Sequence, residues 1–225
     1  MSLKIYNISK RITPFTPAST EGDFIANTSK VFNDNKIDVR VFLPRYGYIS
    51  ERKYILREVI RLKEICVNAD NKECISSVKS AFIPDSRVQV YFNIFPEYYK
   101  DISKAVTSNY QQPKNINVYH AFLMFSMAAV NTLEQLYWKP DVILCYNWQS
   151  ALIPILLRTK LKDHEWFRNT KVVTVISSDE PFYAFPKEVL SYFLPDMDTA
   201  KISSDPAELL RQSISFSDGV IQLQS

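Results

Sequence analysis

The side chains best suited to acid–base, nucleophilic or metal chemistry are few and widely spaced in this sequence. There are two histidines, His120 and His164, and three cysteines, Cys66, Cys74 and Cys145, with no CxxC spacing. Structural metal sites normally set their ligands closer together, and a reactive cysteine needs a cation or base nearby. The sequence therefore predicts no metal site, no cofactor and no nucleophile pair, and it indicates the reduced thiols of a cytoplasmic protein.

Glycine is scarce, with only Gly22, Gly47 and Gly219 among 225 residues. Loops that cradle phosphate rely on glycines because backbone N–H groups must approach the anion closely. A glycine-rich phosphate loop therefore has few places in this chain.

The bulk composition is that of an ordinary globular protein, with 46% hydrophobic and 23% charged residues. A net charge of +3 without a long basic run excludes an electrostatic footprint for nucleic acid. No apolar run in the sequence reaches the roughly 20 residues of a membrane span. We therefore expect neither a nucleic-acid nor a membrane partner.

Strand-like and helix-like segments alternate along the chain. Residues 51–67 fit both patterns, with a strand after a short helical turn slightly favoured, and the polar stretch 101–115 is expected to be a loop. Asn117 is expected to cap the longest helix, and Pro84-Asp85-Ser86 to turn a hairpin. Strands are expected at 3–8, 37–43, 78–83, 88–92, 142–145, 172–176 and 220–223, and helices at 20–32, 117–137, 149–160, 187–193 and 206–216.

This alternation predicts an α/β fold with a Rossmann-like, doubly wound, mostly parallel sheet, helices on both faces and an added β-hairpin. Ligands of such sheets bind where the strands end at their carboxyl edge. The loops that matter for function are therefore expected at 9–23, 44–50, 145–149 and 177–186.

Four segments carry a resemblance to a known family: Asp38 to Gly47, Val90 to Tyr99, Trp138 to Leu157, and Ser217 to Ile221. Together they resemble the glycosyltransferase family of bacterial glycogen synthase and plant starch synthase, and their order and spacing match across nearly the whole chain. The segment Trp138 to Leu157 is similar to the family pattern W-x-P-D-I-I-H-x-H-D-W-H-[TS]-A-L-x-P.

The resemblance implies the N-terminal domain of the two-domain GT-B fold, in which ADP- or UDP-glucose donates glucose to an α-1,4-glucan with retention of configuration and without metal. Residues 1–225 are then a single synthase-like domain, and the C-terminal domain that carries the family's nucleotide-sugar pocket is absent from them. The implied ligands are an α-glucan and a nucleotide-sugar, with a partner protein or a homo-oligomer as further candidates.

The first loop departs from the family pattern Lys-[TS]-Gly-Gly-Leu-Ala-Asp. Pro17 stands at the lysine position, and Ser19 and Thr20 replace the two glycines. Glu21 adds a carboxylate where a diphosphate would lie, and two like charges about 4 Å apart repel by about 4 kcal/mol at an effective dielectric constant of about 20. We expect weakened donor binding.

The motif after the central strand departs in the same way. The family's His-x-His-Asp-Trp-His aligns with Leu144 to Gln149, so the catalytic-site histidine becomes Gln149, which can bond a sugar hydroxyl but cannot take up a proton near neutral pH. No catalytic residue is predicted. The residues that could contact substrate by family position are Asp23, Arg45, Tyr46, Asn147, Trp148, Gln149 and Ser177.

Several of these positions have structural alternatives. Asp23 can simply stabilise a helix N-terminus, Arg45 and Tyr46 can support their own loop, and packing is favoured over a sugar platform for Trp148. Three hypotheses follow: a synthase-like domain without activity of its own, an active transferase completed by another chain or by further residues, and an interaction module anchored by exposed tyrosines (Tyr46, Tyr48, Tyr98, Tyr99 and Tyr146).

Overall fold

The computed structural model describes residues 2–69, 72–99, 102, 113–194 and 198–224. Their strands form one sheet in the order β3-β5-β6-β2-β1-β7-β8-β9, with β4 paired to β5 outside this path. Neighbours from β6 to β9 run parallel, whereas β3, β4 and β6 pair with β5 in antiparallel fashion. The strands are β1 Lys4–Ile8, β2 Asp38–Pro44, β3 Arg57–Glu58, β4 Ile65–Ala69, β5 Lys72–Phe82, β6 Gln89–Ile94, β7 Val142–Tyr146, β8 Lys171–Ser177 and β9 Gly219–Leu223.

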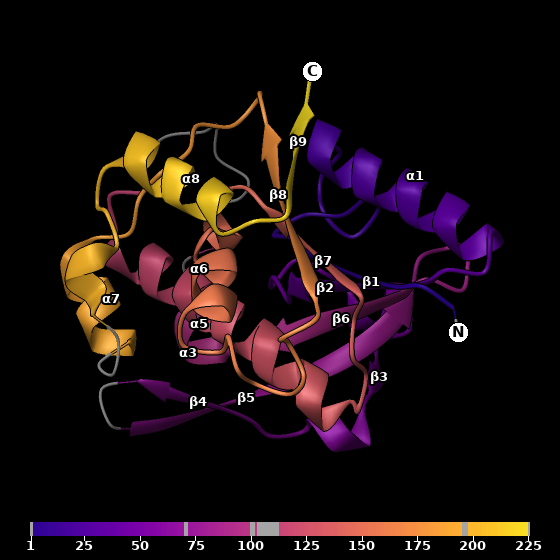
Figure 1. Cartoon of the computed structure of the whole chain (residues 1–225). Helices are drawn as coiled ribbons and strands as arrows, with labels where there is room; N and C mark the ends of the chain where they lie inside the picture. The colour runs from indigo at the N-terminus through magenta and orange to yellow at the C-terminus, as the bar shows by residue number, and fades with distance from the viewer. Residues whose placement is uncertain (1, 70–71, 100–101, 103–112, 195–197, 225) are drawn as a thin grey trace.

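Helices cover both faces of this sheet, as the sequence predicts (Figure 1). Helix α1 lies on the face opposite to α5, α6 and α8, because β1 leads to β2 in the opposite direction along the sheet from the later crossovers. The helices are α1 Thr20–Asp34, α2 Glu51–Tyr54, α3 Pro96–Tyr99, α5 Ile116–Gln135, α6 Leu152–Arg158, α7 Lys187–Phe193 and α8 Pro206–Ser215, with 3-10 turns η1 Ile60–Leu62, η2 Trp148–Ser150 and η3 Thr199–Lys201.

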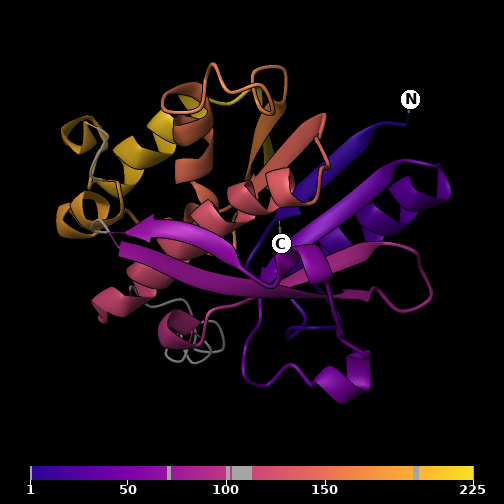
Figure 2. The same cartoon turned by 90° about the horizontal axis from the view of Figure 1, so that it is seen from below.

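The added hairpin is larger than the sequence pattern indicates. Strand β5 runs for 11 residues and forms antiparallel ladders with both β4 and β6, so two hairpins extend from the parallel sheet (Figure 2). The turn at Asp85, with φ 58°, connects β5 to β6 as expected. In residues 51–67 the helical turn α2 is present, but the strand after it is divided into β3 and β4 by the η1 turn.

Two helices begin at residues other than those expected from the sequence. The cap of α5 is Asn115, whose side chain accepts a hydrogen bond from the Asn117 N–H, so Asn117 is inside the helix. The predicted helix 149–160 is shorter, because residues 148–150 form a 3-10 turn before α6. Most of the predicted loop 101–115 lies outside the described residues.

Helix α5 passes through the hydrophobic core. It is the one described helix that is long and apolar enough to cross a membrane, but 72% of its apolar window is buried inside the fold. Its side chains pack against β4, β6 and the η2 turn, and Phe125 stacks on Phe42 of β2. Burial of this kind is typical of the core helix of a globular domain.

Candidate functional site

The carboxyl ends of β1, β7 and β8 meet at one edge of the sheet, because these strands are parallel neighbours. The residues that follow them are Ser9 and Lys10 after β1, Asn147 after β7, and the loop 178–186 after β8. Parallel pairing thus brings together three of the loops that the sequence singles out.

A buried ion pair lies at the centre of this edge. The Lys10 ammonium contacts the Glu180 carboxylate, and both side chains are only 5% exposed. Gln149 Nε2 donates a second hydrogen bond to Glu180 at 2.8 Å, and Asn147 Nδ2 approaches its other oxygen at 3.4 Å. The residues that could face a ligand are therefore bonded to one another.

Glu21 joins the same network from the first turn of α1. Its carboxylate accepts hydrogen bonds from the Ser9 hydroxyl and from Asn147 Nδ2, the latter at 2.6 Å. Glu21 is 2% exposed and lies in the first turn of α1 near Lys10; its expected effect on donor binding stays a prediction. Its carboxylate points into the protein because it lies on the buried face of α1.

Burial is the largest cause of the pKa shifts of Lys10 and Glu21 in this cluster. Desolvation lowers the pKa of the Lys10 ammonium, and the neighbouring Glu180 and Glu21 carboxylates oppose that change. Desolvation likewise raises the pKa of Glu21, opposed by Lys10. With Arg11, which is 9% exposed, the cluster holds two cationic and two anionic side chains and is close to electrically neutral.

Local geometry fixes the first loop against α1. The Ser19 side chain caps α1 by accepting from the Gly22 N–H at 3.1 Å. A Cβ at Gly22 would come within 3.1 Å of both Ser19 Oγ and Thr13 Oγ1. A side chain at Gly22 would therefore require Ser19 and Thr13 to shift by a few tenths of an ångström, so glycine suits this close approach of the loop to the helix next to Glu21.

Apart from Trp148, the candidate residues fall into two groups, one in or beside the network and one outside it. Asn147, Gln149 and Ser177 meet in the network, since the Ser177 N–H donates to Asn147 Oδ1 at 2.8 Å. Tyr46 adjoins it, because its hydroxyl donates to the Lys10 carbonyl at 2.9 Å. Arg45 and Asp23 do not enter it: Arg45 pairs with Glu51 at 3.2 Å, and Asp23 is exposed in the first turn of α1.

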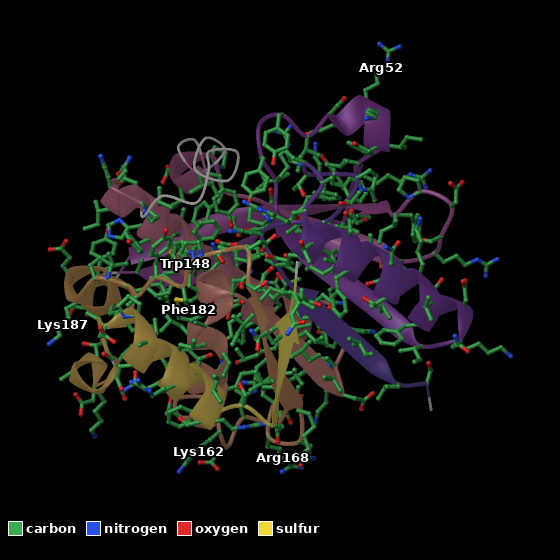
Figure 3. All side chains as sticks on the ribbon, turned by 90° about the horizontal axis from the view of Figure 1, so that it is seen from above. Arg52, Trp148, Lys162, Arg168, Phe182 and Lys187 are labelled. Carbon is green, nitrogen blue, oxygen red and sulfur yellow. The ribbon has the colours of Figure 1, made fainter. Side chains whose placement is uncertain are left out.

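Trp148 packs in the interior, which is the alternative favoured for it by the sequence. It is 2% exposed, and its ring contacts Tyr119, Phe122, Tyr183 and Phe185. Figure 3 shows Trp148 inside the molecule and Phe182 on the loop after β8, while Arg52, Lys162, Arg168 and Lys187 point outward at the periphery. The indole is thus unavailable as an exposed sugar platform in this state.

Lys10 and Glu180 were missed as site residues by the sequence reasoning. The available signal was their position, since both are charged residues in the first turns after buried strands, within loops named as functional. Among the described residues, no group of three His, Cys, Asp or Glu could hold a metal ion. All three cysteines are free, and burial raises the pKa of the Cys145 thiol.

Comparison with known proteins matches nearly the whole chain to starch and glycogen synthases. Residues 4–223 match the family model described as the starch synthase catalytic domain. The chain is 30% identical over 219 residues to the glycogen synthase of Chlorobium phaeovibrioides, covering 96% of this chain and 45% of that protein. It is 32% identical over 193 residues to the glycogen synthase of Chlorobium chlorochromatii, covering 86% and 39%.

A solved structure has the same fold. The catalytic domain of starch synthase IV from Arabidopsis thaliana, bound to ADP and acarbose, superposes with a TM-score of 0.76 at 19% identity, covering 98% of this chain and 44% of that one. The chain thus spans less than half the length of the relatives it matches.

Proposed function

The chain belongs to the starch synthase catalytic domain family, and from this premise we propose that it is a synthase-like domain that does not transfer glucose by itself. In this proposal it contributes a binding or scaffold role in α-glucan metabolism, in the cytoplasm, with an α-glucan or a nucleotide-sugar as ligand. A partner protein or a second copy of the chain would complete its assembly.

One observation carries this proposal: three cationic or amide donors at the ligand edge of the sheet are bonded to carboxylates of the same chain. Lys10 pairs with Glu180, and both Asn147 and Gln149 donate to carboxylates. Catalysis requires interactions that strengthen in the transition state, and these three donors are already engaged. Gln149 also provides no proton at the position where the family has histidine.

The direct test is glucosyl transfer from ADP-glucose and UDP-glucose to glycogen. The chain alone is expected to give no incorporation above a heat-denatured sample. The full-length Chlorobium phaeovibrioides glycogen synthase serves as the positive control under the same conditions. Incorporation by this chain alone that disappears in a Gln149→Ala variant would refute the proposal.

A second candidate function rests on chain length. Because the chain covers 45% of a relative that is named glycogen synthase, another chain or further residues that correspond to the rest of that relative would complete an active transferase. Mixing this chain with the remaining half of that relative, produced as a separate protein, is then expected to restore transfer. A mixture that associates in light scattering and still transfers no glucose would exclude this candidate.

An interaction module anchored by exposed tyrosines has less support. Tyr46, Tyr99 and Tyr146 are at most 4% exposed, and their hydroxyls donate hydrogen bonds inside the chain. Of the five tyrosines, Tyr48 is the one with a large exposed area, at 43%. The cluster expected at the surface is therefore mostly part of the core.

A further inference from the structure

Three hydrogen-bond donors converge on the Glu180 carboxylate. The Lys10 ammonium and Gln149 Nε2 both contact Oε1, and Asn147 Nδ2 faces Oε2. Each of the three donor residues is at most 4% exposed. A buried set of donors that includes a cation is the chemistry of an oxyanion receptor, and here the bound oxyanion is a carboxylate of the same chain.

Contacts that do not involve Glu180 hold the Asn147 side chain and the backbones of Lys10 and Gln149. Asn147 is fixed by Glu21 and by the Ser177 N–H. The Gln149 carbonyl accepts from Ser126 Oγ of α5 at 2.9 Å, and the Lys10 carbonyl accepts from the Tyr46 hydroxyl. The receptor is thus built on strand ends and a core helix, and removal of Glu180 leaves its frame intact.

Glu180 itself comes from a segment without regular structure. Residues 181–186 between β8 and α7 form neither helix nor strand. The segment is held mainly by the Tyr183 and Phe185 rings against Trp148 and by the backbone bond from Ser178 N–H to the Leu223 carbonyl. Of the two partners of the ion pair, Glu180 is the one that lies beyond the end of β8 and is carried by this irregular backbone.

The charge of the buried site determines which kind of ligand can take the place of the Glu180 carboxylate. Lys10 forms its buried ion pair with Glu180, so withdrawal of Glu180 leaves the Lys10 ammonium in a buried site without that partner. Such a charge is costly unless an anion takes its place. A group with several acceptor oxygens matches the donor set, because Lys10, Gln149 and Asn147 all offer N–H groups to it.

We infer that Lys10, Asn147 and Gln149 form an oxyanion site that Glu180 occupies from within and that accepts a phosphate group when Glu180 leaves. The inference rests on the proposed function only in treating the carboxyl edge as the ligand-facing side of the domain. The phosphate belongs either to free inorganic phosphate or to a nucleotide-sugar. In both cases Glu180 competes with the ligand for Lys10.

The test is calorimetric titration of inorganic phosphate and of ADP-glucose into the whole chain and its variants. Glu180→Ala is expected to bind phosphate at least about tenfold more tightly than the parent, because the competing carboxylate is gone. Lys10→Met combined with Glu180→Ala is expected to lose that gain. Glu188→Ala, which removes an exposed carboxylate from α7, is the matched control for net charge and is expected to behave like the parent.

The two ligands distinguish the source of the phosphate. If ADP-glucose competes with inorganic phosphate for the Glu180→Ala site, the site accepts a nucleotide-sugar; if only inorganic phosphate binds, the ligand is free phosphate. A folded Glu180→Ala variant that binds neither ligand more tightly than the parent would overturn the inference.

Thermal unfolding gives a second readout in case Glu180→Ala is too unstable to titrate. Phosphate, compared with chloride at equal ionic strength, is expected to raise the Tm of Glu180→Ala and to leave the Tm of the double variant unchanged. Equal effects of the two salts would contradict the site. Glucosyl transfer measured on the same samples separates the two proposals: activity of the parent refutes the proposed function, whereas absent phosphate binding by Glu180→Ala refutes only this inference.

Discussion

Asn147 has the most unusual backbone among the residues of the site. Its φ of 54° and ψ of −166° lie in a region that is normally occupied by glycine and that costs other residues about 1–3 kcal/mol. The conformation is held by side-chain hydrogen bonds to Glu21 and from the Ser177 N–H. Strain at this position is therefore offset by the network that it helps to form.

We predict that Asn147→Ala destabilises the protein more than Asn147→Gly, by about 1 kcal/mol. Both variants lose the side-chain hydrogen bonds, but glycine also relieves the strained backbone, and this gain exceeds its greater entropy in the unfolded chain. Free energies of unfolding from urea titrations measure the difference. At Ser150, in the adjacent 3-10 turn, the order should reverse: Ser150→Gly should have a lower free energy of unfolding than Ser150→Ala. A less stable Asn147→Gly would rule out stored strain at Asn147.

For single residues, the sequence predicted which of them lie at the site better than it predicted which residues they bond to. Asn147, Gln149 and Ser177 do meet, because parallel strands bring their carboxyl ends together. Their partners Lys10 and Glu180 are 170 residues apart in the chain. No local pattern indicates that two charged loop residues will pair in the interior, since most such residues remain solvated.

Helix caps show how a local rule can select the wrong residue at the scale of an element. The segment 115–117 offers two asparagines, and both fit the preference for asparagine at an N-cap. Asn115 has the extended backbone, φ −93° and ψ 120°, and the side-chain contact of the cap. The choice depends on where the helix is held by the core, which residues 115–117 alone do not reveal.

We predict that Asn115→Ala lowers the free energy of unfolding by about 1 kcal/mol, because the Asn117 N–H loses its acceptor. Asn117→Ala is the matched variant, and it should change stability by about 0.5 kcal/mol or less, since it exchanges an exposed residue inside the first helical turn. Chemical denaturation of both variants supplies the values. Equal losses would show that the two positions contribute alike.

Asp218 links three elements at the start of β9. Its carboxylate accepts from the Val172 N–H of β8 at 2.9 Å, from Lys171 at 3.0 Å and from Arg158 of α6 at 2.5 Å. Desolvation alone would raise the pKa of this carboxyl, but these hydrogen bonds together lower it below its ordinary value of 3.8. A depressed carboxyl pKa stabilises the fold above the unfolded-state value and loses that contribution as the pH falls through the folded-state value.

We therefore predict that Asp218→Asn destabilises the protein near neutral pH and that its deficit relative to the parent shrinks below about pH 4. Urea titrations at a series of pH values from 7 to 3 measure this convergence. Asp163→Asn, which alters an exposed carboxylate, should leave the parent's profile unchanged. A deficit for Asp218→Asn that stays constant across the range would mean that packing, rather than charge, is what Asp218 contributes.

For the whole molecule, sequence patterns predict the type of sheet and its covered faces but not the order of its strands. The alternation of strands and helices predicts parallel pairing and two covered faces, and both are present. The sequence pattern predicts only part of the antiparallel extension, because buried and exposed residues do not alternate regularly along β4 and β5. Ile75, for example, is 53% exposed although it lies in a long strand. Strand order depends on contacts between distant segments, so periodicity along the chain does not predict it.

The position of each strand in the sheet leads to a prediction for hydrogen exchange. Strand β1 pairs with β2 and β7, and its residues from Ile5 to Ile8 are buried. Among the strands that the structure describes, β9 pairs with β8 alone, and Val220 is 46% exposed. Because amides in central, doubly paired strands open only with the global unfolding of the domain, peptides covering β1 should exchange most slowly in mass spectrometry, and those covering β9 much faster. Equal protection of the two strands would require that β9 be covered in solution, which would identify that edge as an interface.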